Sequence, residues 1–173
     1  MKGIIAICLK NMIKDNYSIE KWNEILELSD IDPYIIINAV QDFDDDIILK
    51  MVDSTCKVLN ISLEQAADAF GEYWMKTFAP KIYEVYFREV ESAKDFILKM
   101  NKVHSSVTSN IPNAKPPKFK YEWKDDRTLV IEYISHRNLI DIMIGLIRGV
   151  GKYFDEELKV RKLSDTKAEV VFP

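Results

Sequence analysis

The sequence has few of the side chains that metal and redox centres usually require. Two of its 173 residues are cysteines and two are histidines. Neither Cys8 nor Cys56 has a second cysteine or a histidine at the spacing of metal ligands. This pattern excludes a zinc cluster of the usual spacing and predicts that both cysteines are buried, reduced thiols.

A phosphate-binding loop and a basic surface are also missing. No glycine belongs to a Gly-Lys-Ser/Thr loop, and Gly145, Gly149 and Gly151 fall within an expected helix at the wrong spacing. The net charge is −4 and the basic residues are dispersed, so no stripe of positive charge exists to neutralise phosphates. These features argue against nucleotide chemistry and against a nucleic-acid partner.

Long apolar runs are absent as well. The apolar stretch 4–9 is short and soon followed by charged residues, so we expect no signal peptide and a cytoplasmic protein. The most apolar longer stretch, 139–147, is interrupted by Asp141 and ends at Arg148, far short of the ~20 residues of a membrane span. It predicts a core helix instead.

The length and composition are those of a single globular domain. The chain is 47% hydrophobic and contains no low-complexity segment, and at 173 residues it can bury a sizeable core. No Gly- or Ser-rich linker divides it. We therefore expect one domain over residues 1–173, with an N-terminal helical subdomain over 1–60 and a second subdomain over 61–173.

The first two thirds of the chain show the spacing of helices. Apolar residues recur at three and four around residues 4–12 and 22–26, with Tyr17-Ser18 between, and again after Asp44-Asp45-Asp46 to residue 59. We interpret that acidic run as the first turn of a helix, where the helix dipole favours carboxylates, rather than as a metal site. Ser62-Leu63-Glu64-Gln65 has the form of a capping box that opens a helix reaching Phe78, and Pro80 either stops this helix or starts a short successor. A further helix is expected over 92–108.

The remaining sequence predicts strands. Residues 118–123 and 127–133 flank a turn at 124–126, and 158–162 and 167–172 flank a turn at 164–166, with a helix over 138–157 between the two hairpins. The expected fold class is α+β, a mostly helical N-terminal part followed by a largely antiparallel sheet with one intervening helix.

Three hydrogen-bond donors near the end of the second strand form the first candidate site. If the segment is extended, Tyr133, Ser135 and Arg137 face one way in a row about 13 Å long. Such a row suits a ligand with two separated carboxylates, although an ordinary solvent-facing strand could carry the same residues. His136 would face the opposite side, which leaves His104 as the better candidate for a metal ligand.

His104 lies on the apolar face of the helix expected over 92–108. A lone histidine there is more often a core residue than a ligand. Combined with the donor row and an apolar pocket, however, it suggests a heme, with the imidazole on the iron and the donors on the propionates. A heme enzyme, an oxygen carrier and a heme-free domain that binds a dicarboxylate remain alternatives.

The whole chain resembles a known family, the heme nitric oxide/oxygen binding (H-NOX) domains, which include the heme domain of soluble guanylate cyclase. The resemblance is carried by Met1-Lys2-Gly3, Trp22, Ile25-Leu26, Phe70-Gly71, His104, Pro116-Pro117 and Tyr133-x-Ser135-x-Arg137. The last of these resembles the propionate-binding motif of the family.

The resemblance implies a fold that encloses heme b (iron protoporphyrin IX). It implies that His104 is the proximal ligand, that Tyr133, Ser135 and Arg137 hold the propionates, and that Pro117 presses on the heme and distorts it. It also implies a distal pocket whose members form i, i+4 pairs on helix faces: Ile5, Leu9, Trp74, Phe78, Ile142 and Leu146.

One departure from the family bears on gas selectivity. Ile142 stands where oxygen-binding members have a distal tyrosine, and Trp74 is the only donor left in the set. Bound oxygen gathers negative charge that a donor stabilises, whereas nitric oxide binds ferrous heme without one. We therefore expect a nitric oxide sensor that can also bind carbon monoxide, with weak oxygen binding through Trp74 left open.

The resemblance further implies a sensor rather than an enzyme. Nitric oxide would weaken or release the bond to His104, and the change would be read by a partner protein or a fused output domain. In bacterial members that partner is commonly a histidine kinase, a cyclic-di-GMP enzyme or a chemotaxis receptor. The sequence contains no signature of those activities.

Overall fold

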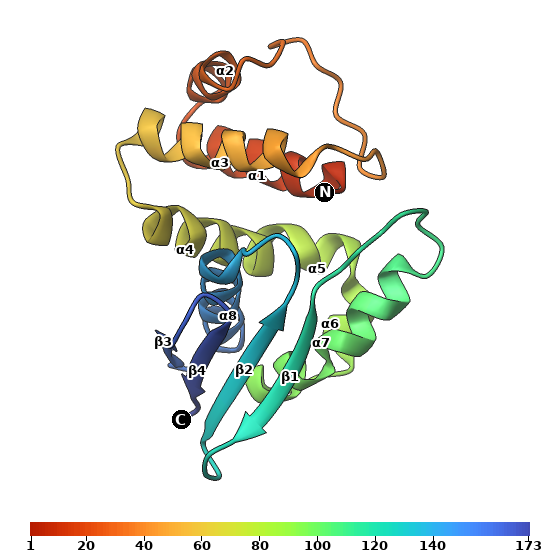
Figure 1. Ribbon diagram of the computed structural model, residues 1–173, viewed down its shortest axis with the longest axis vertical. Coiled ribbons are helices and arrows are strands. Elements are labelled where there is room, and N and C mark those ends of the chain that lie inside the picture. The colour runs from red at the N-terminus through yellow and green to blue at the C-terminus, as the bar shows by residue number, and fades with distance from the viewer. The chain divides into compact units, whose positions relative to one another are not determined.

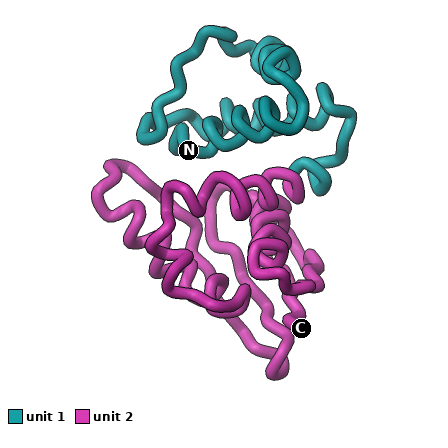
Figure 2. Tube along the Cα trace, turned by 180° about the vertical axis from the view of Figure 1, so that it is seen from behind, with its two compact units in different colours: residues 1–66 teal, residues 67–173 magenta.

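The computed structural model describes all 173 residues and divides the chain into two compact units. One unit comprises Met1–Ala66 and the other Ala67–Pro173, drawn in different colours in Figure 2. The division falls inside a helix rather than at a linker. No helix is long and apolar enough to cross a membrane.

The first unit is a group of helices, with a long loop over 30–44 between the second and the third. Its main helices are α1 (Gly3–Asn16), α2 (Ile19–Leu28) and α3 (Asp45–Leu59). Ser18 caps α2 by accepting a hydrogen bond from the backbone N–H of Lys21. Asp44 is the N-cap residue of α3 and two further aspartates occupy its first turn, which confirms the interpretation of the acidic run.

The core of the first unit lies where α2 packs against both α1 and α3. Its largest fully buried side chains are Met12, Ile13, Trp22, Ile25, Leu26, Ile48 and Met51. Burying one such side chain contributes about 1.5–3 kcal/mol to the free energy of unfolding. Cys8 is buried as predicted, but the prediction for Cys56 is wrong because its position on α3 leaves it half-buried.

Helices of the second unit begin with α4 (Leu63–Tyr73), for which the predicted capping box is present. The Ser62 hydroxyl oxygen accepts from the Gln65 backbone N–H at 3.1 Å, and the Gln65 side chain accepts from the Ser62 N–H at 2.9 Å. The other helices are α5 (Ala79–Ile82), α6 (Glu84–Arg88), α7 (Ala93–Thr108) and α8 (Ile140–Phe154).

A π-helical turn, η1 (Trp74–Phe78), interrupts the long helix that the sequence predicts up to Phe78. It is closed by the Ala79 backbone N–H, which donates to the Trp74 carbonyl. Pro80 gives the physical reason, because it has no N–H for the Lys76 carbonyl and its ring would clash with that oxygen. The helix therefore widens by one residue before the proline.

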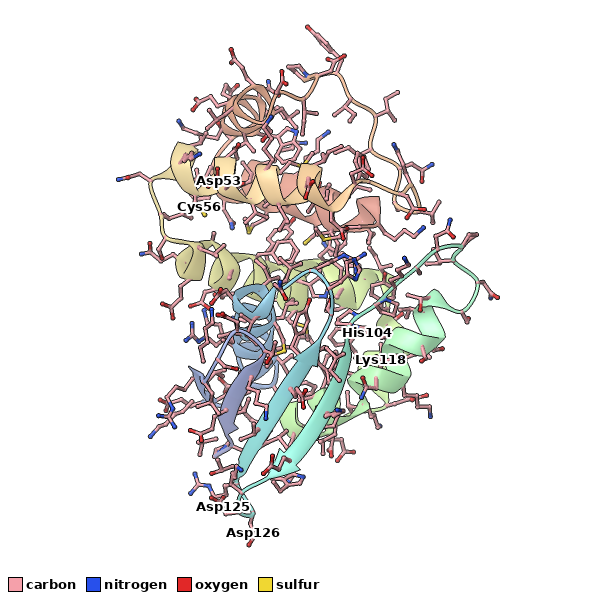
Figure 3. All side chains as sticks on the ribbon, viewed as in Figure 1. Asp53, Cys56, His104, Lys118, Asp125 and Asp126 are labelled. Carbon is pink, nitrogen blue, oxygen red and sulfur yellow. The ribbon has the colours of Figure 1, made fainter.

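The sheet of the second unit is antiparallel throughout, as predicted. Its strands are β1 (Lys118–Trp123), β2 (Thr128–Ile134), β3 (Lys159–Lys162) and β4 (Lys167–Val171), in the order β1-β2-β4-β3. Asp125 and Asp126 mark the tip of the first hairpin (Figure 3), where the Asp125 carboxylate accepts from the backbone N–H groups of Arg127 and Thr128. Because β1 is first in the strand order, it is an edge strand of the sheet.

One face of the sheet packs against helices α7 and α8, seen behind the strands in Figure 1. Leu129, Ile131 and Tyr133 of β2 point into this core together with Phe96 and Ile97 of α7 and Ile140, Met143, Ile144 and Ile147 of α8. Helices followed by an antiparallel sheet with one helix between its hairpins form the predicted α+β arrangement.

Helices α4 and α8 cross with their backbones in contact. A Cβ atom at Gly71 would lie 2.0 Å from the Gly145 carbonyl oxygen, and one at Gly149 would lie 2.3 Å from the Gly71 carbonyl oxygen. Only glycine permits such an approach. Arg148 pairs with both carboxylate oxygens of Asp68 at 2.9 Å beside this crossing. The crossing fixes α8, which continues from the candidate donor segment.

Candidate functional site

His104 lies in the C-terminal half of α7, facing the loop that leads into β1. Its side chain is half-buried, and Nδ1 lies 3.3 Å from the carbonyl oxygen of Pro117. A carbonyl only accepts, so Nδ1 is the donor and the lone pair of Nε2 remains available to a metal. Burial lowers the pKa of His104, while the bond to Pro117 opposes that shift. The neutral imidazole is the form that ligates metals.

Phe119, on β1, joins His104 to the first residue of the donor segment. Its ring centroid lies 5.6 Å from the His104 ring and 6.2 Å from the Tyr133 ring. Phe119 and Tyr133 are also cross-strand partners in the register of β1 and β2. The Tyr133 ring is buried in the core, which fixes the position of its hydroxyl. Figure 3 shows His104 close to Lys118, where α7 approaches the start of β1.

The donor segment is not one extended row. β2 ends at Ile134, so Ser135 lies beyond the strand and His136-Arg137 form a turn before Asn138 at φ 52°. The expectation that Tyr133, Ser135 and Arg137 share one face of a strand is therefore wrong. The physical reason is the reversal of the chain that starts α8 at Ile140, which requires a turn immediately after the strand.

Contacts of the turn nevertheless lead back to His104. The Arg137 backbone N–H donates to the Ser135 hydroxyl oxygen at 3.3 Å, which leaves the hydroxyl proton free to be donated elsewhere. The Arg137 guanidinium donates through Nη1 to the Lys115 carbonyl at 2.7 Å. Lys115 is two residues before Pro117, so the loop 115–117 contacts both the candidate proximal histidine and the candidate propionate arginine.

Four of the six expected distal residues lie in the second unit, on two elements that pack together. Trp74 and Phe78 belong to η1, with ring centroids 5.4 Å apart, and α8 packs against η1. Ile142 and Leu146 are half-buried residues of α8. The remaining two, Ile5 and Leu9, are residues of α1 in the first unit, where Ile5 is half-buried and Leu9 is buried.

Sequence reasoning missed two residues that organise the surroundings of His104. Asn101 lies on the same face of α7 as His104, three residues earlier, and bonds to the backbone of Phe119. A polar residue on an otherwise apolar helix face is a signal that could have identified it. The alternation of aromatic residues at 119, 121 and 123 could have identified Phe119 as a member of one strand face.

The donor set has the chemistry that an iron porphyrin requires. An imidazole with a free nitrogen can ligate the iron, and a guanidinium, a phenol and a hydroxyl can bind two carboxylates. Apolar side chains on η1 and α8 can enclose a flat hydrophobic ring. The residues present therefore fit a heme held by His104, Tyr133, Ser135 and Arg137.

Fold and donor set together define the class as a heme-binding sensor domain. The model of the Haem-NO-binding family matches residues 2–162. The chain therefore belongs to this family, the H-NOX domains, which bind heme, sense gases and are related to soluble guanylate cyclase.

Two curated relatives support the same assignment. Soluble guanylate cyclase gcy-35 of Caenorhabditis elegans is 23% identical over 98% of the chain, and gcy-32 of the same organism is 25% identical over 88%. The aligned regions are 25% and 23% of those proteins, so the chain spans about a quarter of the length of the curated relatives it matches.

Solved structures confirm the predicted fold. A mutant of the T. tengcongensis H-NOX protein is 26% identical, with a TM-score of 0.83 over 99% of this chain and 97% of that one. An S. oneidensis H-NOX protein has a TM-score of 0.88 at 16% identity, over 100% and 96% of the two chains. An oxygen-binding H-NOX domain solved as its oxygen complex has a TM-score of 0.82 at 23% identity, over 99% and 95%.

Proposed function

We propose that this chain is a sensor of nitric oxide that uses ferrous heme b, with His104 as the proximal ligand. The observation that carries the proposal is the hydrogen bond from His104 Nδ1 to the Pro117 carbonyl, which leaves Nε2 for the metal. When bound, the heme would be held by His104 and would supply an iron able to bind a diatomic gas.

Three residues around the turn after β2 hold the carboxylates of the cofactor in this proposal. Tyr133 contributes a phenol whose ring is fixed in the core, Ser135 a hydroxyl with its proton available, and Arg137 a guanidinium steadied by the Lys115 carbonyl. Charge-assisted bonds from arginine are the strongest of the set. Pro117 supplies a rigid ring next to the ligand histidine, and we assign to it the distortion of the porphyrin.

Selectivity follows from the apolar distal residues. Phe78, Ile142 and Leu146 carry no hydrogen-bond donor, and we assign the same apolar lining role to Ile5 and Leu9. Nitric oxide needs no donor, whereas bound oxygen does. The indole N–H of Trp74 favours a second candidate function, weak oxygen binding, and carbon monoxide is a further ligand of ferrous heme.

The output of the sensor lies outside the residues that bind the cofactor. His104 would transmit the signal: weakening or release of its bond to the iron would free the end of α7 that carries it, and a partner protein or a fused output domain would read the change. A histidine kinase, a cyclic-di-GMP enzyme and a chemotaxis receptor are the classes of partner proposed. The domain itself is proposed to be cytoplasmic and to catalyse no reaction.

Absorption spectra of the purified, reduced protein test the cofactor and its selectivity together. We expect a heme band that shifts on addition of nitric oxide and is unchanged by air. A protein that stays colourless when expressed with ample heme would instead support the heme-free dicarboxylate-binding domain. A band that shifts in air and stays shifted would show a stable oxygen complex and would contradict selectivity for nitric oxide.

The two histidines of the chain provide a matched pair of variants. His104→Gly should lose the proximal ligand and regain a heme spectrum when imidazole is added. His136→Gly removes an exposed histidine of the turn and should leave the spectrum as it was. An unchanged spectrum in His104→Gly, or loss of heme in His136→Gly, would refute the assignment of the ligand.

A further inference from the structure

Helix α7 is buried unevenly along its length. Its buried residues, Ala93, Phe96 and Ile97, all lie in the first third of the helix, and every residue after Ile97 is half-buried or exposed. The packing of the core therefore holds the beginning of α7 more firmly than the end, where His104 lies.

The side chain of Asn101 binds both backbone groups of Phe119. Asn101 Nδ2 donates to the Phe119 carbonyl at 2.7 Å, and the Phe119 N–H donates to Asn101 Oδ1 at 2.9 Å. Because β1 is an edge strand and both groups of Phe119 point away from β2, the amide takes the place of a neighbouring strand. The two bonds fix α7 against β1 at one register.

Two further contacts join α7 to the chain around β1, one on each side of Asn101. The Tyr121 hydroxyl donates to the Ile97 carbonyl at 2.7 Å, and His104 Nδ1 donates to the Pro117 carbonyl at 3.3 Å. Along α7 the three contacts are made at residues 97, 101 and 104. Their partners are at residues 121, 119 and 117, so the two segments run antiparallel.

That stepping has a geometric reason. Four residues of helix rise about 6 Å, and two residues of extended chain rise about 6.6 Å, so an antiparallel helix and strand stay in register over several such contacts. Tyr121–Ile97, Asn101–Phe119 and His104–Pro117 are therefore successive contacts of one ladder. The third contact contains the proposed metal ligand.

We propose that Asn101 is a positioning residue and the fulcrum of α7. It sets the register that places His104 against Pro117. It also prevents a displacement of His104 from moving the part of α7 that precedes Asn101. Movement is then confined to residues 102–116, whose exposed members include Lys102, Ser105, Ser106 and Ser109. The role as a fulcrum rests on the proposed function, whereas the register rests on the hydrogen bonds alone.

The experiment compares Asn101→Leu, which removes both bonds, with Asn101→Asp, which keeps the acceptor for the Phe119 N–H and loses the donor. Lys102→Leu is the control, because it changes an exposed neighbour on the same helix. Hydrogen exchange of the Phe119 amide should become at least about tenfold faster in Asn101→Leu, less so in Asn101→Asp, and remain unchanged in Lys102→Leu. Unaltered exchange of the Phe119 amide in Asn101→Leu would show that the two hydrogen bonds from Asn101 do not fix α7 against β1.

The fulcrum is tested on the same proteins by adding nitric oxide to the reduced, heme-loaded form. Exchange should change over 102–116 but not over 93–100, and in Asn101→Leu the change should spread into 93–100, with a shifted iron–histidine stretching band. Spreading in the unmodified protein would overturn the fulcrum. A protein that takes up no heme would refute the proposed function. The exchange of the Phe119 amide would still test whether Asn101 sets the register of α7 on β1.

Discussion

His104 and Arg137 are linked through one short loop, residues 115–117. Pro117 accepts a hydrogen bond from His104 at 3.3 Å, and Lys115, two residues earlier, accepts one from Arg137 at 2.7 Å. The proposed ligand of the iron and the proposed ligand of a propionate therefore contact the same loop, two residues apart. Displacement of His104 acts directly on the loop that also steadies Arg137, which couples the two sides of the proposed heme site.

A donor introduced on α8 should change the gas selectivity. Ile142→Tyr places a phenol in the apolar distal set, and a hydrogen bond to bound oxygen of about 1–1.5 kcal/mol would slow its dissociation about tenfold. Stopped-flow measurement of oxygen dissociation from the reduced protein checks this. Ile142→Phe has nearly the same size without the hydroxyl and is the control. Equal effects of tyrosine and phenylalanine would attribute selectivity to volume rather than polarity.

Removal of the guanidinium should weaken retention of the cofactor. Arg137→Ala deletes a charged donor whose bonds contribute about 1.5–3 kcal/mol each, so heme should dissociate at least about tenfold faster. Transfer of heme to an acceptor apoprotein measures the rate. Arg88→Ala is the matched control, since Arg88 forms an exposed pair with Glu84 on α6. Equal rates in the two variants would remove Arg137 from the proposed site.

Local signals in the sequence were enough to predict most of the fold. The capping box at Ser62 and Gln65 and the turn at Asp125 depend on neighbours within three residues, and both are present. The antiparallel pairing of 118–123 with the following strand needs only a short turn.

Other features depend on contacts between residues distant in sequence and were not predicted. The π turn at Trp74 leaves no local pattern that distinguishes it from an ordinary helix, and the polar residue Asn101 on an apolar helix face does not reveal that its partner is the backbone of Phe119. The turn at Arg137 was missed because alternation of polar residues fits an exposed strand and a strand end equally well. Residue types therefore suggested a heme site, while packing determines how its members are arranged.

The crossing of α4 and α8 predicts an unusual sign for a helix substitution. Gly→Ala in a helix normally stabilises by about 1 kcal/mol. At Gly145 the new Cβ would lie 2.2 Å from the Ala67 carbonyl oxygen, so the helices must separate and Gly145→Ala should destabilise by roughly 1–3 kcal/mol. Thermal unfolding measures the change. A raised melting temperature, as propensity alone would give, would contradict the close crossing.

The same crossing carries an ion pair that should make stability depend on pH. Lys152 on α8 donates to the Glu72 carboxylate on α4, and this hydrogen bond is the main cause that lowers the pKa of Glu72, with Lys76 adding to it. A carboxyl group whose pKa is lower in the folded state stabilises at neutral pH, and the contribution disappears as the pH falls through that pKa. Glu72→Gln should therefore be less stable than the parent at pH 7 and equal to it in acid.

Because the pair is largely exposed, the difference should not exceed about 1 kcal/mol and should shrink in high salt. Urea unfolding at a series of pH values, with the exposed Glu157→Gln as control, measures it, and a difference that persists unchanged into acid would exclude the ion pair as its cause.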